Sequence, residues 1–154
     1  MGKKLAEALI LRADAQKRLE QVRQRLLRSA KVQEGDSPAE DPMGLKRELD
    51  QLSEELIRLI QRINRTNSQS VLASGETFSD ALAVRDVLKL KHSFYRDLAE
   101  AATVTQDRNT RSEIKFQSTV DVATIQHEAD RAAKEHREID TKIQAANWQI
   151  DLVE

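Results

Sequence analysis

The chain has 154 residues, of which 33% are charged, 39% hydrophobic and only 3% aromatic. It contains four glycines, two prolines and no cysteine, and its formal net charge is −1. The lack of cysteine excludes disulfide scaffolds, cysteine nucleophiles and thiolate metal sites. So few turn-forming residues disfavour an all-β sandwich or barrel, and the many charges favour long, solvated helices. We therefore expect one mainly α domain over residues 1–154, an elongated four-helix antiparallel bundle or coiled coil.

The charge is distributed in blocks that alternate in sign. Residues 1–31 carry nine basic and three acidic groups, a net charge of +6. Residues 32–56 carry two basic and eight acidic groups, a net charge of −6. Segments of opposite charge can neutralise each other when they pack side by side, whereas a nucleic-acid-binding domain is more often basic as a whole. The blocks therefore favour internal complementarity over nucleic-acid binding.

Two helices are predicted in the first half of the chain. Residues 3–30 contain no glycine or proline, and their apolar residues recur at steps of three and four, which is the helical period. A loop with Gly35, Pro38 and Pro42 follows, and Asp41 and Pro42 suit the cap and first position of a second helix over residues 42–65. A heptad seam runs along this helix: Leu45, Leu49, Leu52, Leu56, Leu59 and Ile63.

The middle of the chain changes character at residues 64–76, which are rich in Asn, Ser and Thr. A short β-hairpin is expected there, pairing residues 70–72 with 76–78 around a turn at Ser74 and Gly75. Thr77 can then cap a third helix over residues 77–103. This helix carries two apolar stripes, which predicts burial over a wide arc. The first stripe is Ala81, Val84, Leu88, Tyr95 and Ala102, and the second is Ala83, Val87, Leu90, Phe94, Leu98 and Ala101.

The last third of the chain begins with a polar and basic segment, residues 104–118. Apolar and polar residues alternate at its end, which predicts a short strand at residues 113–117. The last helix is expected over residues 119–148, with the most regular heptad pattern in the chain. That pattern comprises Val122, Ile125, Ala129, Ala132, His136, Ile139, Ile143, Ala146, Ile150 and Val153.

Several stretches resemble a family of small bacterial proteins labelled septicolysin-like. They are AEALILRADAQKRLEQ, PAEDP, INRTNS, DALAVRDVL, RSEIKFQSTVDVATIQHEAD and IQAANW, and together they extend over nearly the whole chain. The resemblance implies a mainly helical, oligomeric and functionally uncharacterised protein, and it supplies no catalytic residues. The label suggests a cytolysin, but the sequence has no signal peptide, aromatic membrane tip or amphipathic hairpin of pore-forming type.

Few residues form a pattern that carries chemistry. No glycine-rich phosphate loop and no serine-nucleophile motif is present, so we name no catalytic residue and favour a non-enzymatic role. His136 and Asp140 are one helical turn apart and could supply two metal ligands. Because His136 lies on the heptad seam, a packed histidine is the favoured interpretation. We therefore expect neither a metal site nor a cofactor.

The best candidates for a ligand site are polar residues outside the heptad patterns. Arg and Asn in irregular segments can bind phosphate, carboxylate or bases, and a lone Trp can anchor a contact. The alternative, which we favour, is that these groups cap helices, form salt bridges and fill one end of the bundle. Convergence of residues 64–67 with 108–113 would favour the ligand site. The candidates are Asn64, Arg65, Asn67, Arg85, Asp86, Arg108, Arg111, Glu113 and Trp148.

The function that this pattern favours is that of a self-associating structural or protein-interaction protein, a homo-oligomer in the cytoplasm. Apolar runs are far shorter than the roughly 20 residues of a membrane-spanning helix. One alternative is nucleic-acid binding through the basic segments 1–31 and 104–115. The other is metal or ligand binding at an Asn, Arg and His site.

Overall fold

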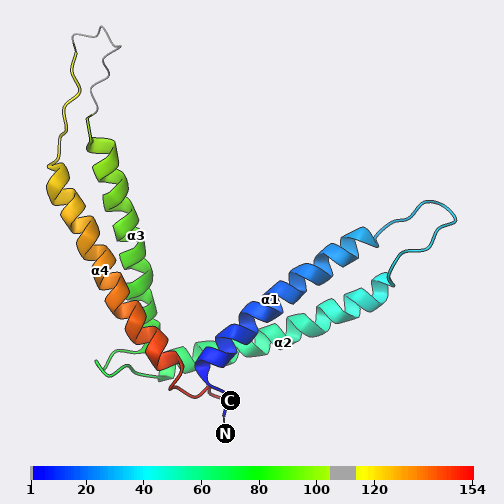
Figure 1. Ribbon diagram of the computed structural model, residues 1–154. Coiled ribbons are helices and arrows are strands. Elements are labelled where there is room, and N and C mark those ends of the chain that lie inside the picture. Colours follow the sequence, from blue (N-terminus) through cyan, green and yellow to red (C-terminus); the bar gives the residue numbers. More distant parts are fainter. Residues whose placement is uncertain (1, 105–113) are drawn as a thin grey trace. The chain divides into compact units, whose positions relative to one another are not determined.

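The computed structural model of the protein describes residues 2–104 and 114–154. These residues form four α-helices, shown in chain order in Figure 1. They are α1 (Leu5–Arg28), α2 (Pro42–Gln69), α3 (Phe78–Ala102) and α4 (Val122–Asn147). No β-strand is present in the described part of the chain. The expected mainly α class with four helices is therefore confirmed.

The predicted β-hairpin is not supported as a pair of strands, because the segment forms a tight turn with single bridge residues at Val71 and Thr77. The Leu72 N–H donates to the Glu76 carbonyl at 2.8 Å, and the Gly75 N–H donates to the Leu72 carbonyl at 2.9 Å. Gly75 has a φ of 92°, a conformation that favours glycine. Helices α2 and α3 reach to within a few residues of this turn, so no length of chain is left for strands. Residues 114–117, the described part of the predicted 113–117 strand, are also irregular.

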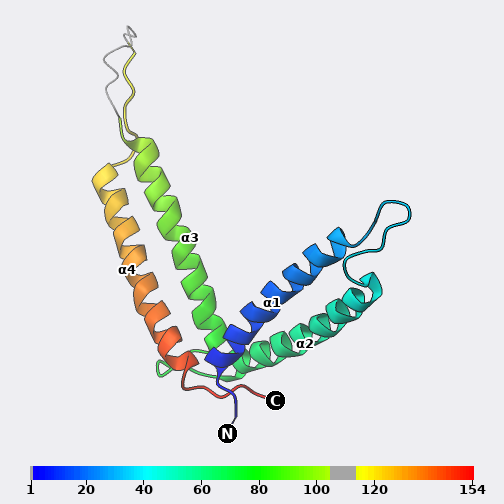
Figure 2. The same cartoon turned by 45° about the vertical axis from the view of Figure 1, so that its right-hand side comes forward.

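Contacts divide the chain into two compact units. Unit 1 comprises Met1–Val71 and Ala145–Glu154, and unit 2 comprises Leu72–Gln144. Each unit contains an antiparallel helix pair, α1 with α2 in unit 1 and α3 with most of α4 in unit 2 (Figure 1 and Figure 2). A single domain that includes all four helices stays a prediction.

Local sequence signals account for the starts of two helices. The Asp41 carboxylate accepts hydrogen bonds from the backbone N–H groups of Met43 and Gly44, and Pro42 occupies the first turn. The Thr77 hydroxyl accepts from the Asp80 N–H at 3.1 Å. Each cap satisfies N–H groups that have no partner within the helix, and both confirm the predicted starts.

The α1–α2 pair is held together by apolar residues at helical spacing on both helices. Ala8, Ala15 and Val22 of α1 are buried, and so are Leu45, Leu52 and Ile63 of α2. This pairing places the basic first block beside the acidic second block. Arg25 of α1 donates to Glu40 at 3.0 Å and lies 3.6 Å from Glu48 of α2.

The Arg25–Glu40 pair makes the stability of unit 1 depend on pH. Hydrogen bonds from the Arg25 guanidinium hold the pKa of the Glu40 carboxyl below its ordinary value of 4.5. A lowered pKa in the folded state means that the stabilisation is present above pH 4.5. The stabilisation begins to be lost as the pH falls below 4.5. The loss is complete once the pH is below the lowered pKa of Glu40 in the folded protein.

A Glu40→Gln variant should therefore differ from the wild type in a pH-dependent way. We expect it to be less stable at pH 7, because the carboxylate that accepts from Arg25 is absent. The difference should shrink as both proteins are brought to acid pH, where Glu40 itself becomes protonated. Urea unfolding of both proteins at several pH values measures this difference. A gap that is the same at pH 7 and at pH 3.5 would contradict the assignment.

Helix α2 continues to Gln69, four residues beyond its predicted end at Arg65. The polar run 64–69 suggested a break, but Thr66 is completely buried. Its hydroxyl donates to the Arg62 carbonyl at 2.8 Å and accepts from the Val153 N–H at 3.0 Å. Tertiary contacts thus extend the helix through residues of modest helix propensity.

Residues 3–5 and 149–154 pair with each other beside this end of α2, and we call the arrangement the terminal clasp. The Leu5 N–H donates to the Ile150 carbonyl at 2.9 Å, and the Leu152 N–H donates to the Lys3 carbonyl at 2.8 Å. Lys4 forms an ion pair with Asp151 at 2.7 Å. The heptad pattern predicted a helical seam as far as Val153, whereas α4 ends at Asn147 and residues 150–153 serve the clasp.

A Thr66→Val variant should destabilise the protein by about 1–2 kcal/mol, because it removes the acceptor of the Val153 N–H without changing the side-chain size. Thr141→Val on α4 is the matched control. The Thr141 hydroxyl also donates to a carbonyl four residues earlier, at 2.8 Å, but Thr141 is exposed. Chemical unfolding of the two variants measures the difference. Equal losses would show that the bond to Val153 contributes nothing.

The α3–α4 pair in unit 2 is packed through small residues. Ala81 and Ala99 of α3 and Ala129 and Ala132 of α4 are buried, together with Phe78 at the start of α3. Polar contacts cross the pair as well. Arg85 of α3 lies 3.4 Å from Asp140 of α4. His92 Nδ1 donates to the Ala129 carbonyl at 2.9 Å, since a carbonyl can only accept.

Candidate functional site

The most distinctive surface in unit 2 is the second apolar stripe of α3, which we call the α3 apolar face. It consists of Ala83, Val87, Leu90, Phe94, Leu98 and Ala101, all of which are exposed. Phe94 is 66% exposed, Val87 60% and Leu90 55%. The expectation that α3 is buried over a wide arc is therefore wrong for this stripe. Within unit 2, α4 lies along one side of α3 and covers most of the first stripe, of which Val84 stays 45% exposed.

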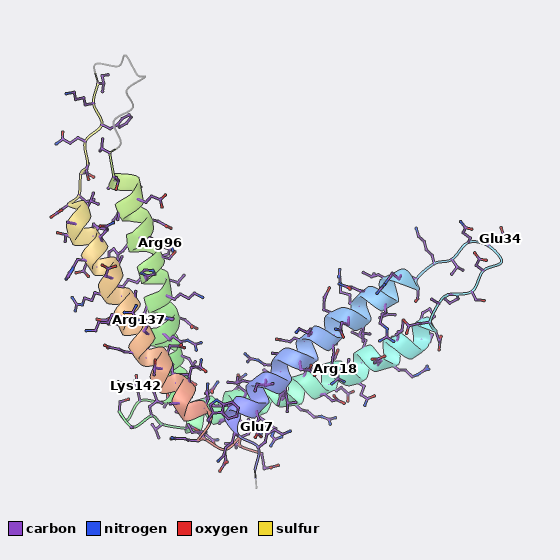
Figure 3. All side chains as sticks on the ribbon, viewed as in Figure 1. Glu7, Arg18, Glu34, Arg96, Arg137 and Lys142 are labelled. Atoms are coloured by element: carbon purple, nitrogen blue, oxygen red, sulfur yellow. The ribbon has the colours of Figure 1, made fainter. Side chains whose placement is uncertain are left out.

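Helix α4 serves as an internal comparison for this surface. The two helices are of similar length and lie side by side in both views (Figure 1 and Figure 2). All of α4 is described, and none of its large hydrophobic side chains is exposed to the extent seen on α3. Its exposed residues include Arg137 and Lys142, drawn in Figure 3. One helix of the pair has a polar outer surface and the other an apolar one.

The α3 apolar face continues into a groove at the C-terminal end of α3. This groove has a volume of about 370 Å³, and its walls include Leu98, Ala101, Val104 and Phe116. Phe116 is 88% exposed, although burying a phenylalanine side chain removes a large apolar area from water. Contiguous exposed apolar surface of this kind marks an interaction site more often than single apolar residues do.

A second, more polar groove lies between α3 and α4 and has a volume of about 760 Å³. Its lining includes His92, Arg96, Glu100 and Asp130. Two of the charged or titratable side chains already have protein partners, since His92 donates to Ala129 and Arg96 lies 3.7 Å from Asp97. Nothing in the sequence patterns pointed to this groove, because it depends on the register between α3 and α4.

The predicted ligand-site residues fall into three groups. Asn64 and Arg65 are exposed and Asn67 half-buried, all on the last turns of α2, while Trp148 follows α4 and is 57% exposed. Arg85 and Asp86 are brought together at 3.3 Å, and Arg85 also pairs with Asp140. Arg108, Arg111 and Glu113 lie outside the described residues. The proposed convergence of residues 64–67 with 108–113 stays a prediction.

Arg62 and Thr66, near this group, have structural contacts that the sequence patterns did not predict. The Arg62 Nε donates to the Val153 carbonyl at 3.0 Å, opposite the bond from Val153 to Thr66. The sequence carried no local signal for these contacts, because Val153 is 87 positions away from Thr66. In these hydrogen bonds, Arg62 and Thr66 hold the terminal clasp in place and bind other parts of the protein.

The described residues contain neither a metal-binding cluster nor a membrane-spanning helix. No cluster of three or more His, Asp or Glu side chains there could hold a metal ion. Asp140, the predicted partner of His136, pairs instead with Arg85. No helix in residues 2–104 or 114–154 is long and apolar enough to cross a membrane.

In the part of the chain that the structure describes, the fold and surface define a protein made of paired helices, in which α3 carries an uncovered apolar face. The chain belongs to a family of unknown function, DUF6847, which matches residues 12–152. It is also similar to a functionally unknown conserved protein from Corynebacterium diphtheriae, whose crystal structure has 48% sequence identity and a TM-score of 0.93. That match covers 99% of this chain and all of the other. None of the curated proteins matches.

These comparisons agree with the general expectation from the sequence, because both the family and the solved relative are of unknown function. The crystal structure at 48% identity shows that a natural relative adopts the same fold over nearly its whole length. The comparisons give no support to the septicolysin-like label in particular. Function therefore has to be argued from the surface of the molecule.

Proposed function

We propose that the protein is a self-associating helical interaction protein and that its copies associate through the α3 apolar face. The single observation that carries this proposal is the contrast between the two helices of unit 2. Phe94, Leu90 and Val87 on α3 are more than half exposed, while the outer surface of α4 is polar. Exposed apolar side chains at helical spacing gain free energy when a second helix covers them.

Association would also give the second apolar stripe of α3 a partner. Two α3–α4 pairs that meet through α3 contain four helices, so the antiparallel bundle expected from the sequence would form between copies. Coiled-coil packing at the new seam, a homo-oligomeric state and a cytoplasmic location all belong to this proposal. The septicolysin-like resemblance stays a prediction and contributes nothing to it.

Native mass spectrometry of the full chain, purified gently at low salt, tests the proposal directly. We expect a species with an even multiple of the mass of one chain and no additional bound mass. Light scattering at low and high salt should give the same mass, because apolar association does not depend on ion pairing. A monomer at micromolar concentration in both measurements would overturn the proposal.

The two alternatives have less support from specific contacts. Several basic residues of α1 lie beside acidic neighbours: Arg18 is 3.7 Å from Asp14, and Arg23 is 3.1 Å from Glu20. Such pairing weakens the attraction to phosphates on which nucleic-acid binding depends. The same native spectrum would reveal a bound nucleic acid, metal or metabolite as extra mass.

A further inference from the structure

We infer that two copies of the chain pair along α3 in antiparallel orientation, about a twofold axis that passes near residue 92. This inference rests on the proposed self-association and adds its geometry and partner. The occupant of the α3 apolar face is then the same face of a second copy. A dimer with twofold symmetry requires a surface that is complementary to itself, because each contact occurs twice.

The α3 apolar face has this property along its length. Ala83 and Ala101 lie nine residues before and after residue 92, and Leu90 and Phe94 lie two residues before and after it. In antiparallel orientation, Leu90 of one copy therefore lies opposite Phe94 of the other, and Ala83 lies opposite Ala101. Large residues meet at the centre and small residues meet at the ends.

The intermediate positions obey the same symmetry. Val87 precedes residue 92 by five positions and Leu98 follows it by six, so the two lie within one residue of facing each other. At a rise of about 1.5 Å per residue the mismatch is about 1.5 Å. Val84, which is 45% exposed, then faces the groove that Leu98 and Ala101 of the other copy help to form.

Charge disfavours the parallel alternative. Asp97 borders the α3 apolar face, seven residues after Leu90, and is exposed. Parallel, in-register pairing would bring Asp97 directly opposite Asp97 of the second copy, and two facing carboxylates at a seam repel each other. In antiparallel pairing about residue 92 the two copies of Asp97 are instead about 15 Å apart along the axis, so this repulsion is largely removed. Antiparallel helices also align their dipoles favourably.

Engineered cysteines test this orientation, and the natural chain has none that would interfere. Val87→Cys and Leu98→Cys are made as separate full-length variants, mixed under reducing conditions and then oxidised. A disulfide needs Cα atoms within about 7 Å of each other. In the antiparallel dimer, two copies of residue 87 are about 15 Å apart along the axis, and two copies of residue 98 about 18 Å.

We therefore expect disulfide-linked dimer in the mixture and little in either variant alone. Lys134→Cys on the exposed surface of α4 is the matched control and should not cross-link. Efficient cross-linking of Val87→Cys alone would indicate parallel pairing and overturn the inference. If native mass spectrometry shows an oligomer but the mixture does not cross-link, this inference fails and the proposed self-association stands. If native mass spectrometry shows a monomer, both fail.

Discussion

Replacing Phe94 by Glu should abolish the proposed self-association without unfolding the chain. Phe94 is at the centre of the α3 apolar face and is 66% exposed, so a charged side chain there is well tolerated in the monomer. In the associated state the same carboxylate would lose its hydration against an apolar neighbour. Central aromatic residues of interfaces typically contribute about 2 kcal/mol or more, which corresponds to roughly 30-fold weaker association.

Sedimentation velocity over a concentration series measures this weakening, and circular dichroism checks that the helix content is unchanged. The matched control is Gln144→Glu, which introduces the same carboxylate at an exposed position of α4. We expect this control to associate like the wild type. If Phe94→Glu associates as strongly as Gln144→Glu, then the α3 apolar face is not the interface.

The largest expected effect on stability is that of Phe78→Ala. Phe78 is fully buried at the first position of α3, and among the described residues it is the largest side chain that is completely inaccessible. Truncation to alanine removes most of the buried ring and leaves a cavity, which typically costs about 3–5 kcal/mol. We expect a correspondingly large fall in the denaturant concentration at the midpoint of unfolding.

Phe116→Ala provides the control with the same chemical change in an exposed setting. Phe116 is 88% exposed in the single chain, so its loss should change stability by no more than about 0.5 kcal/mol. Measurements at low protein concentration keep association from contributing to the comparison. Equal losses in the two variants would show that burial of Phe78 is not what stabilises unit 2.

Local sequence determined where the helices begin and which residues line them. Asp41 and Thr77 cap α2 and α3 as predicted, because a cap depends on a side chain and N–H groups two or three residues away. The apolar periodicity also identified both stripes of α3. These features involve neighbours along the chain, and the information needed to predict them is therefore contained in short segments.

Tertiary structure decided where helices end and which apolar stripes are covered. Helix α2 extends to Gln69 because Thr66 is buried against Val153, a residue 87 positions away. Residues 150–153 leave the helical pattern because Leu5 and Lys3 offer backbone partners. Tertiary structure also decided the role of the candidate ligand residue Arg85. It forms an ion pair with Asp140 on α4 as well as with its neighbour Asp86.

The α3 apolar face illustrates the same division. Its sequence pattern is as regular as that of the covered stripe, so periodicity alone predicts burial for both. Which stripe is covered depends on how α4 packs against α3, and the contacts through Ala81, Ala99 and Ala129 select the first stripe. A periodic pattern of apolar residues predicts that a helix has an apolar face. Only the packing of the folded chain determines whether another part of the same chain buries that face.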